Sequence, residues 1–589
     1  MKKKLFSIVL FSCFSLFSFS QENEKTFLEK AKSDLIHDLN NGKNEFWILF
    51  NEQADVSGAR QLKTKEEKGE YVYKKLTSTA DRIQPAFYSL LENKHAEYQT
   101  FWIVNAIYVK GDIQLAKEIS AYPEVKELLP NVKFVEEKII DPIEERIAQQ
   151  DATSVNTVEW GITKVNAPSV WALGYKGQGV VVSGHDTGYD WTHLALKNAY
   201  RGWNGSVADH NFNWHDAIHS GGGTCGADSK QPCDDSQHGT HTMGTMVGDD
   251  GAGNQIGMAP SARWIGCRNM NVGVGTTASY IECFQWLLAP TDSNNQNANP
   301  SKAPHVINNS WGCDPSETGC TNPADITNME TAVKNLVAAG VVVVVSAGNS
   351  GSGCNTITTP SAIYDASFTV GATTSSDAIA SYSSRGNVSI NNTTLIKPNV
   401  SAPGSSIRSS VPGGGYASMS GTSMAGPHVV GAVALLISAV PSLAGQVDTI
   451  ESILERTAVR ITSTQTCNGT DPTMFPNNTV GYGRIDILAA VNDAISHHPL
   501  SVSEQNKYDN GITVFPTPAD DKLYFRFENF RNIQADVTFF NTTGQIVLEQ
   551  KTNTQNNSLE IPVTTLPEGF YLYSIKANDT TYHGKFIKK

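Results

Sequence analysis

A run of five valines constrains the fold of this chain more than any other feature of its sequence. The run lies in the segment GVVVVVSAG (340–348). A strand without polar alternation is typical of the centre of a parallel sheet, where helices cover both faces. The preceding segment NMETAVKNLVAAG (328–340) predicts a helix that ends at Gly340. Buried strands that alternate with helices predict an α/β fold, in which helices wrap a parallel sheet.

The length of 589 residues exceeds one ordinary domain, so we expect several. The first segment, MKKKLFSIVLFSCFSLFSFS, has a basic start and a short apolar run. It predicts a secretory signal peptide over 1–20. A membrane anchor is the alternative, but the run is short for crossing a bilayer.

The region that follows the signal predicts a small α+β unit over 21–150. It holds no cysteine and is rich in lysine and glutamate. We expect three strands over 45–50, 99–111 and 132–137, and one helix over 112–125. The polar stretch 144–156 predicts an exposed linker. Beyond it, a region rich in glycine, serine and valine predicts the wrapped sheet, over 157–497.

The last region predicts a small all-β sandwich over 509–589, after a linker over 498–508. Short alternating segments such as KLYFRF, ADVTFF and FYLYSIKA are separated by turn residues. This region also lacks cysteine.

The net charge of −13 and the isoelectric point near 5.6 limit the class of partner. An acidic chain is a poor match for nucleic acid or for an anionic membrane, and we expect neither as a main partner. Only 17% of the residues are charged. This composition is typical of a secreted α/β or β-rich protein.

Nine cysteines occur in the chain, and all but Cys13 lie between residues 225 and 467. An even number in an exported protein suggests disulfides, although buried thiols are the alternative. The spacing of cysteines and histidines does not match a zinc site. Short spacing favours Cys225 with Cys233 and Cys313 with Cys320. For the rest we expect Cys267 with Cys283 and Cys354 with Cys467.

Three stretches carry the residue types of serine-based acyl transfer. They are VVVSGHDTGYD (180–190), SQHGTHTMGTMVG (236–248) and SMSGTSMAGPHVVGAVALL (418–436). Such chemistry needs a hydroxyl, an imidazole that takes its proton, and a carboxylate that holds the imidazole's tautomer. Asp186, His238 and Ser423 supply these groups in that chain order. The order excludes the α/β-hydrolase arrangement.

Together the three stretches resemble the signatures of the subtilisin-like serine proteases, peptidase family S8. The resemblance covers roughly 157–497 and implies a triad of Asp186, His238 and Ser423. It assigns His241 and His428 to structural positions. It also explains a glycine- and serine-rich helix start, because a nucleophile there meets the helix dipole and unbonded N–H groups that favour an oxyanion.

The same resemblance implies two further parts of the site. Asn349 in VVSAGNSG (344–351) is implied as the side-chain donor to the oxyanion. Ser310, Trp311 and Gly312 are implied as an exposed strand edge that pairs with the substrate backbone. Segments such as SARWIGCRNM (261–270) are similar to the bacillopeptidase F-like branch.

Two departures from the family pattern stand out. His185 replaces the usual aliphatic residue before the aspartate, and it is expected to influence the acid limb of activity. Ala195 replaces a frequent calcium-ligating aspartate. Asp249, Asp250 and Asn254 are candidate calcium ligands, and a solvated acidic turn is the alternative interpretation. No cofactor is expected to be required.

The flanking regions resemble two known modules. Region 21–150 is similar to the inhibitor-type propeptide of this family, whose closing strand would enter the active cleft; an independent binding domain is the alternative. Region 509–589 contains VFPTPADDKLYF and LPEGFYLYSIKANDTTYHGKFIKK. It resembles the sorting domain of type IX secretion, with a carbohydrate-binding sandwich as the alternative.

These features predict the precursor of a secreted serine endopeptidase that processes itself and acts as a monomer on proteins and peptides. Its expected partners are its own propeptide and the type IX secretion machinery. A catalytically dead binding protein and a peptide ligase are the rival interpretations. The intact triad disfavours the first. The second would need a means of excluding water, and no insertion in the sequence suggests one.

Overall fold

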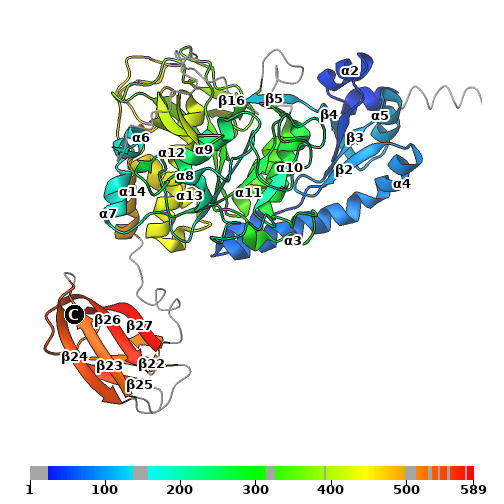
Figure 1. Cartoon of the computed structure of the whole chain (residues 1–589). Coiled ribbons are helices and arrows are strands. Elements are labelled where there is room, and N and C mark those ends of the chain that lie inside the picture. Colours follow the sequence, from blue (N-terminus) through cyan, green and yellow to red (C-terminus); the bar gives the residue numbers. More distant parts are fainter. Residues whose placement is uncertain are drawn as a thin grey trace, which may run out of the picture. The chain divides into compact units, whose positions relative to one another are not determined.

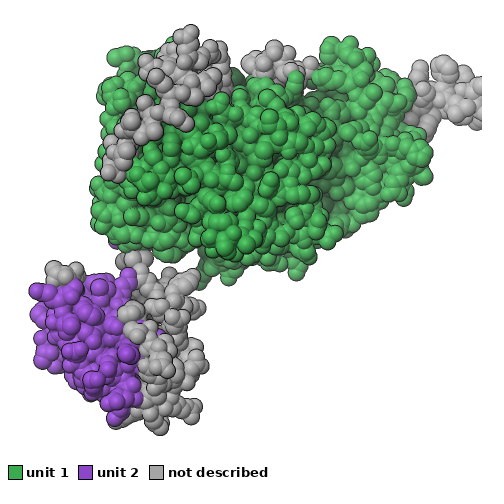
Figure 2. Space-filling model, in the orientation of Figure 1, with its two compact units in different colours: residues 1–494 green, residues 495–589 purple. Residues whose placement is uncertain are grey.

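The computed structural model describes residues 24–136, 157–313, 326–390, 393–497, 512–527, 534–541, 544–553, 558–577 and 580–589. The chain forms two compact units, Met1–Ala494 and Ile495–Lys589, and each is described by itself (Figures 1 and 2). The expected signal peptide and both expected linkers lie outside the described residues. The exact domain bounds given above therefore stay predictions.

The first part of unit 1 is a four-stranded antiparallel sheet with helices packed against it, drawn in blue in Figure 1. Its strands have the order β2-β3-β1-β4. They are β1 (Phe46–Phe50), β2 (Glu97–Phe101), β3 (Ala106–Lys110) and β4 (Val125–Leu129). The helices are α2 (Ser33–Asn40), η1 (Ser57–Gln61), α3 (Lys65–Ile83), α4 (Pro85–Asn93) and α5 (Ile113–Ser120). The α+β class expected for this region is confirmed.

Two expected elements of this part were wrong in detail. The strand expected over 99–111 is a hairpin, because the chain turns back between β2 and β3 through Asn105, whose φ is +37°. The helix expected over 112–125 begins as predicted, with the Asp112 carboxylate accepting hydrogen bonds from two backbone N–H groups. It ends at Ser120, and Pro123 separates it from β4.

The second part of unit 1 is built on a seven-stranded sheet in which every pair is parallel. Its order is β18-β15-β14-β12-β7-β10-β8. The strands are β7 (Val181–Asp186), β8 (Trp214–Asp216), β10 (Arg263–Arg268), β12 (Val306–Asn309), β14 (Val342–Ser346), β15 (Phe368–Thr373) and β18 (Val400–Pro403). Strand β14 carries the valine run, lies inside the sheet between β15 and β12, and is fully buried, as expected.

Two pairs of helices pack against this sheet. Helices α10 (Thr277–Leu288) and α11 (Thr327–Ala338) share a core with Val343 and Val345 of β14. Helices α9 (His238–Val247) and α12 (Thr422–Ala439) pack against each other, and α12 also contacts β12, β14, β15 and β18. Because successive strand residues point to opposite faces, Val342 and Val344 face away from α10 and α11. The wrapped parallel sheet is confirmed.

Smaller elements complete unit 1. The helices are α6 (Trp160–Lys164), α7 (Ala167–Ala172), α8 (Leu194–Lys197), η2 (Pro300–Lys302), η4 (Pro441–Leu443), α13 (Val447–Arg456) and α14 (Ile487–His497). The strands are β5 (Lys133–Glu136), β6 (Thr157–Val158), β9 (Asn254–Gln255), β11 (Val274–Thr276), β13 (Trp311–Gly312), β16 (Val388–Ile390), β17 (Thr393–Leu395), β19 (Ile407–Val411) and β20 (Gly415–Met419). Of all described helices, only α12 is long and apolar enough to cross a membrane, and it is a buried core helix here.

Unit 2 consists of two antiparallel sheets around one apolar core. One sheet has the order β21-β22-β25, and the other β24-β23-β26-β27. The strands are β21 (Ile512–Phe515), β22 (Lys522–Phe527), β23 (Gln534–Phe540), β24 (Ile546–Asn553), β25 (Ser558–Pro562), β26 (Gly569–Ala577) and β27 (Thr580–Lys588). In β22 buried and exposed residues alternate, which is the pattern expected of a strand with one face in a core. The all-β class is confirmed.

Three of the four expected disulfides form between described residues: Cys225–Cys233, Cys267–Cys283 and Cys354–Cys467. Cys313 is also disulfide-bonded, but its expected partner Cys320 lies outside the described residues. The Cys354–Cys467 bond closes a loop of 113 residues, whereas Cys225–Cys233 closes one of 8. A longer closed loop removes more entropy from the unfolded chain.

We predict that removing Cys354–Cys467 costs more stability than removing Cys225–Cys233. Chain entropy gives losses of about 4.8 and about 2.5 kcal/mol for the two loop lengths. The free energies of unfolding of the two double Cys→Ser variants should be compared by denaturant titration, each in a Ser423→Ala background to prevent self-digestion. Equal losses would contradict the prediction.

Candidate active site

The three residues expected to form a triad come from three elements of the parallel-sheet part. Asp186 is the last residue of β7, His238 is the first residue of α9, and Ser423 lies in the first turn of α12. All three side chains are buried. Ligand and active sites of open α/β sheets gather at the carboxyl ends of the strands, and Asp186 lies at such an end.

Asp186 and His238 form a hydrogen-bonded pair. Nδ1 of His238 lies 2.8 Å from Oδ1 and 2.9 Å from Oδ2 of Asp186. A carboxylate accepts hydrogen bonds, so Nδ1 carries a proton and Nε2 is left to accept one. Nε2 of His238 and Oγ of Ser423 are buried and have no hydrogen-bond partner among the described residues. Buried polar atoms without partners are costly, and they are typical of atoms kept for a reaction.

The charge environment of His238 favours its protonated form. Burial lowers the pKa of the imidazole, but the Asp186 carboxylate raises it through charge and hydrogen bonding, and Glu136 and Asp234 add to this effect. The net result is a pKa of about 9. The imidazolium is therefore stabilised chiefly by Asp186, with a smaller contribution from Glu136 of strand β5.

The start of α12 forms hydrogen bonds with the side chain of Asn349. Oδ1 of Asn349 accepts hydrogen bonds from the backbone N–H (2.8 Å) and the hydroxyl (3.0 Å) of Thr422. This orients the amide so that Nδ2 faces Gly421, where a Cβ atom would lie only 3.1 Å away. Glycine at 421 thus leaves room for the amide that the sequence predicted as an oxyanion donor.

Pro427 within α12 leaves the Ser423 carbonyl without its usual helical donor. The hydroxyl of Ser310 lies 3.4 Å from that carbonyl oxygen and donates to it. Ser310 also bonds Ser346 and Asn308. Its side chain therefore supports the start of α12 from inside. Trp311 and Gly312 form strand β13, and this edge, which was expected to be exposed, is buried because β5 pairs with it.

Strand β5 lies between β11 and β13 in a small antiparallel sheet. Val135 pairs with Val274 on one side and Gly312 on the other. The Phe134 side chain is buried, with ring centroids 4.8 Å from Tyr280 and 5.4 Å from Trp311. A segment of the N-terminal part thus occupies the groove beside the site as an added strand.

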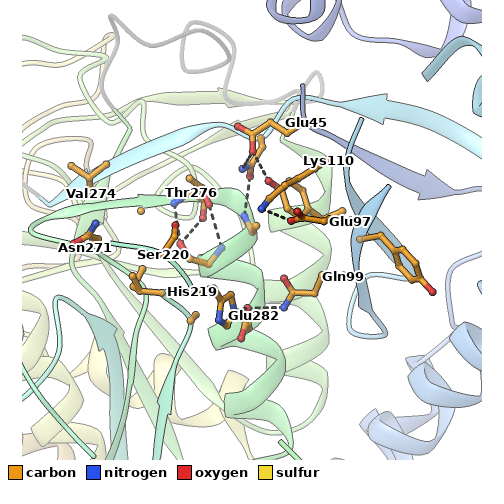
Figure 3. Close-up of a pocket in the computed structure, with 18 residues that line it drawn as sticks. Glu45, Glu97, Gln99, Lys110, His219, Ser220, Asn271, Val274, Thr276 and Glu282 are labelled. Atoms are coloured by element: carbon orange, nitrogen blue, oxygen red, sulfur yellow. Dashed lines mark hydrogen bonds and ion pairs between the residues drawn. The ribbon is translucent and has the colours of Figure 1, made fainter. Parts of the chain in front are cut away.

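The N-terminal part also contacts α10 through polar groups. Gln99 on β2 donates to the Glu282 carboxylate (2.7 Å), which lies 2.9 Å from Nε2 of His219. Figure 3 shows these side chains beside a cavity of about 500 Å³ between the two parts. Two carboxylates, Glu282 and Asp228, raise the pKa of the partly exposed His219 to about 9, with Glu282 the larger influence.

His185 is fully buried against the rings of Phe284 and Trp311. Its Nε2 donates to Oδ1 of Asn309, whose Nδ2 is already bonded to a backbone carbonyl. Burial lowers the pKa of His185 to about 4. The His185 imidazole is therefore neutral near neutral pH. It gains its proton only at a pH below the range in which His238 titrates, so its expected influence on the acid limb of activity falls in that lower range.

The other two motif histidines lie where structural roles are expected. Nε2 of His241 is within hydrogen-bond distance of two backbone carbonyls, those of Ile407 and Ala417. Nδ1 of His428 donates to the Met424 carbonyl at 2.8 Å. Burial lowers the pKa of both imidazoles, to about 3 and about 4 respectively.

The acidic turn considered for calcium is bonded within itself. Asp250 accepts hydrogen bonds from the backbone N–H groups of Ala252 and Asn254 and from the Asn254 amide. Within the described residues, no group of three or more His, Cys, Asp or Glu residues could hold a metal ion. Calcium binding by this protein stays a prediction.

Sequence reasoning did not single out Glu136, Ser236 or Gly273, which meet in the groove. The hydroxyl of Ser236 donates to the Glu136 carboxylate at 3.0 Å, and the Glu136 N–H donates to the Gly273 carbonyl at 2.7 Å. Ser236 lies two residues before His238 in the quoted motif. Its contact with Glu136 depends on how strand β5 pairs with β13, which the sequence does not give.

Two family models match the chain. One, described as the subtilase family, matches residues 177–514, and the other, described as a secretion system C-terminal sorting domain, matches residues 513–589. Among curated proteins, bacillopeptidase F of Bacillus subtilis is 36% identical over 508 residues, covering 82% of this chain and 33% of that protein. The chain thus spans about a third of the length of bacillopeptidase F.

Shorter relatives are covered more fully. Subtilisin E of Bacillus subtilis is 33% identical over 58% of this chain and 73% of that protein. An alkaline protease of Shouchella clausii is 31% identical over 72% of this chain and 88% of that protein. Since the subtilase model matches more than half of the residues, the chain belongs to the subtilase family of serine endopeptidases, and it carries a sorting domain of type IX secretion.

Proposed function

We propose that the chain is the precursor of a secreted serine endopeptidase in which Asp186, His238 and Ser423 form the catalytic triad. The observation that carries the proposal is the buried pair of Asp186 and His238, whose remaining ring nitrogen has no hydrogen-bond partner in the described part of the chain. The start of α12 supplies Ser423. The rival ligase reaction would use the same groups, and no feature of the described residues favours it.

In the proposed reaction, Ser423 Oγ attacks the carbonyl carbon of the scissile peptide while its proton passes to Nε2 of His238. Asp186 holds the imidazole in the required tautomer and stabilises the imidazolium. The oxyanion accepts hydrogen bonds from Nδ2 of Asn349 and from the start of α12. His238 then gives the proton to the leaving amine, and water releases the acyl group by the reverse steps. No metal takes part in these steps, and no cofactor is proposed.

We further propose that the N-terminal part is an intramolecular inhibitor that the enzyme removes by its own activity. Strand β5 fills the groove between β11 and β13, as a bound peptide would. Its backbone hydrogen bonds depend little on side chains, so the same groove suits many protein and peptide substrates. The proposed mature enzyme acts as a monomer.

The sorting domain indicates secretion across the outer membrane. In the proposed pathway the signal peptide over 1–20 leads the chain into the periplasm, and the type IX machinery then recognises 509–589. Exposed linkers concentrate proteolysis, so the stretches 144–156 and 498–508 are the proposed sites of maturation.

Ser423→Ala should abolish hydrolysis and leave the N-terminal part attached. The expected loss in turnover is roughly 10⁶-fold, the scale known for the same change in a subtilisin. Peptide hydrolysis and the mass of the purified chain report the two effects. Ser438→Ala on the same helix is a matched control and should be processed normally. A Ser423→Ala chain that still matures would refute the triad.

Self-processing should require a higher pH than peptide hydrolysis by the mature enzyme. With Glu136 in place the pKa of His238 is about 9, so the base is mostly protonated at neutral pH, and processing should speed up as pH rises toward 9. Loss of Glu136 removes one contribution that raises this pKa, after the larger one of Asp186, so the midpoint for the mature enzyme should lie at lower pH. Rates measured from pH 5 to 10 test this, and coincident profiles would contradict it.

Deleting 509–589 should leave a chain that is competent in hydrolysis but held in the periplasm. The catalytic residues all lie in unit 1, so the deletion removes none of them. Cell fractionation and a peptide assay on each fraction measure the result. A full-length Ser423→Ala chain is the control and should leave the cell. If the truncated chain reaches the medium at normal levels, an adhesive or sugar-binding role for unit 2 becomes the better account.

A further inference from the structure

The Glu136 side chain occupies a small, well-defined place in the groove. Its backbone pairs with Trp311 on one side and donates to Gly273 on the other. One carboxylate oxygen accepts a hydrogen bond of 3.0 Å from the hydroxyl of Ser236. A carboxylate that accepts a hydrogen bond from a fixed donor is held more strongly than a neutral amide in the same place.

Gly273 forms the wall against which this carboxylate lies. Its φ is +77°, a conformation that favours glycine, and a Cβ atom there would lie 2.8 Å from Cδ of Glu136. Two constraints therefore favour glycine at 273. The backbone has a positive φ, and the Glu136 carboxylate fills the space where a Cβ atom would lie. The wall is shaped for a side chain as long as that of glutamate.

The donor Ser236 is fixed by a rigid loop. Its N–H donates to the Asp234 carboxylate at 3.0 Å, and Asp234 also accepts from Thr187 and Thr240. Asp234 directly follows Cys233 of the Cys225–Cys233 disulfide. A donor held by its supporting contacts selects its partner better than one on a mobile loop.

The neighbouring acidic residues do not remove the advantage of a carboxylate here. Asp235 pairs with the buried Arg268 at 3.2 Å and also accepts from the Val272 N–H. Asp234 accepts hydrogen bonds from four hydroxyl or backbone donors, and burial raises its pKa to about 6. Arg268 thus balances the charge of Asp235, and four hydrogen bonds stabilise the charge of Asp234, while the Ser236 hydroxyl donates to Glu136.

We propose that Ser236 and Gly273 form an acid-accepting subsite beside His238, and that the enzyme prefers substrates with glutamate at the position of Glu136. This inference rests on the proposed function, because it specifies which peptides that site cleaves. Strand β5 then serves as a template of the preferred sequence as well as an inhibitor.

The position of this carboxylate gives it a chemical effect as well as a binding effect. Its charge raises the pKa of His238, after the larger contribution of Asp186. The imidazole becomes positively charged in the transition state, so a nearby substrate carboxylate stabilises that state more than the ground state. A glutamate at this position should therefore raise kcat, and not only lower KM.

The test uses the mature enzyme and a peptide with the chain's own sequence 131–142, NVKFVEEKIIDP. Its kcat/KM is compared with that of the Glu136→Gln peptide, and mass spectrometry identifies the bond cut in each. The Lys133→Gln peptide is the matched control, with the same new side chain at an exposed position of the same strand. We expect about a tenfold loss for Glu136→Gln, the scale of one hydrogen bond to a charged group, and less than about a twofold loss for the control.

Enzyme variants assign the effect to Ser236. In Ser236→Ala the ratio of the two kcat/KM values should fall below about threefold, whereas Ser236→Thr, which keeps the hydroxyl, should preserve it. Because each ratio is measured within one enzyme, a general loss of activity cancels. The acid limb of kcat should also lie at higher pH with the Glu136 peptide than with the Glu136→Gln peptide.

The outcomes separate this inference from the proposed function. If the wild-type enzyme cuts none of the peptides, the endopeptidase proposal fails. If it cuts the Glu136 and Glu136→Gln peptides equally well at the same bond, the enzyme is active but the subsite is refuted. A preference that survives Ser236→Ala would refute the role of Ser236.

Discussion

The burial of α12 against the parallel sheet is the interaction on which the rest of the structure depends. Every residue of this helix except Ser438 is buried. Small residues allow the close approach: a Cβ on Gly431 would lie 2.2 Å from Met258, and one on Gly426 would lie 2.9 Å from Asn308. A helix held this firmly fixes Ser423 in its first turn, and the buried Ser310 hydroxyl compensates for the break that Pro427 causes just below it.

The sequence was sufficient to predict the sheet, because burial on both faces leaves a valine run with no polar alternation. It was also sufficient for Asp186, His238 and Ser423, since each lies in a short motif whose residue types suit one reaction. The sequence could not predict that 99–111 splits into a hairpin. The turn between Phe101 and Ala106 contains no glycine or proline, and Asn105 is its one residue with a positive φ. Nor could the sequence reveal the contact of Ser236 with Glu136, because 100 residues separate them and only strand register joins them.

The N-terminal part is held by interactions that differ in how easily they are replaced by water. Strand pairing of β5 supplies backbone contacts. One apolar core, in which Leu76, Phe101 and Phe134 cluster with side chains of α10 and α11, joins the two parts. Polar contacts add to these, as in the bond from Gln99 to Glu282 and the two bonds from backbone N–H groups to Gln285. Water can satisfy these polar groups after separation, whereas exposing the shared apolar core to water costs free energy.

Two buried lysines on α3 weaken this contact further. Lys65 and Lys68 donate to the backbone carbonyls of Ala303 and Gly445. Glu66 and Asp448 offset only part of the effect of burial on their pKa values. Burial lowers the pKa of Lys65 to about 8, so the contact disfavours its charged form. This cost is present in full below pH 8 and falls as the pH rises toward the ordinary lysine value of 10.5. At neutral pH, rehydration of these lysines therefore favours separation of the two parts. A part that first fills the groove and later leaves it needs such a contribution to the free energy of separation.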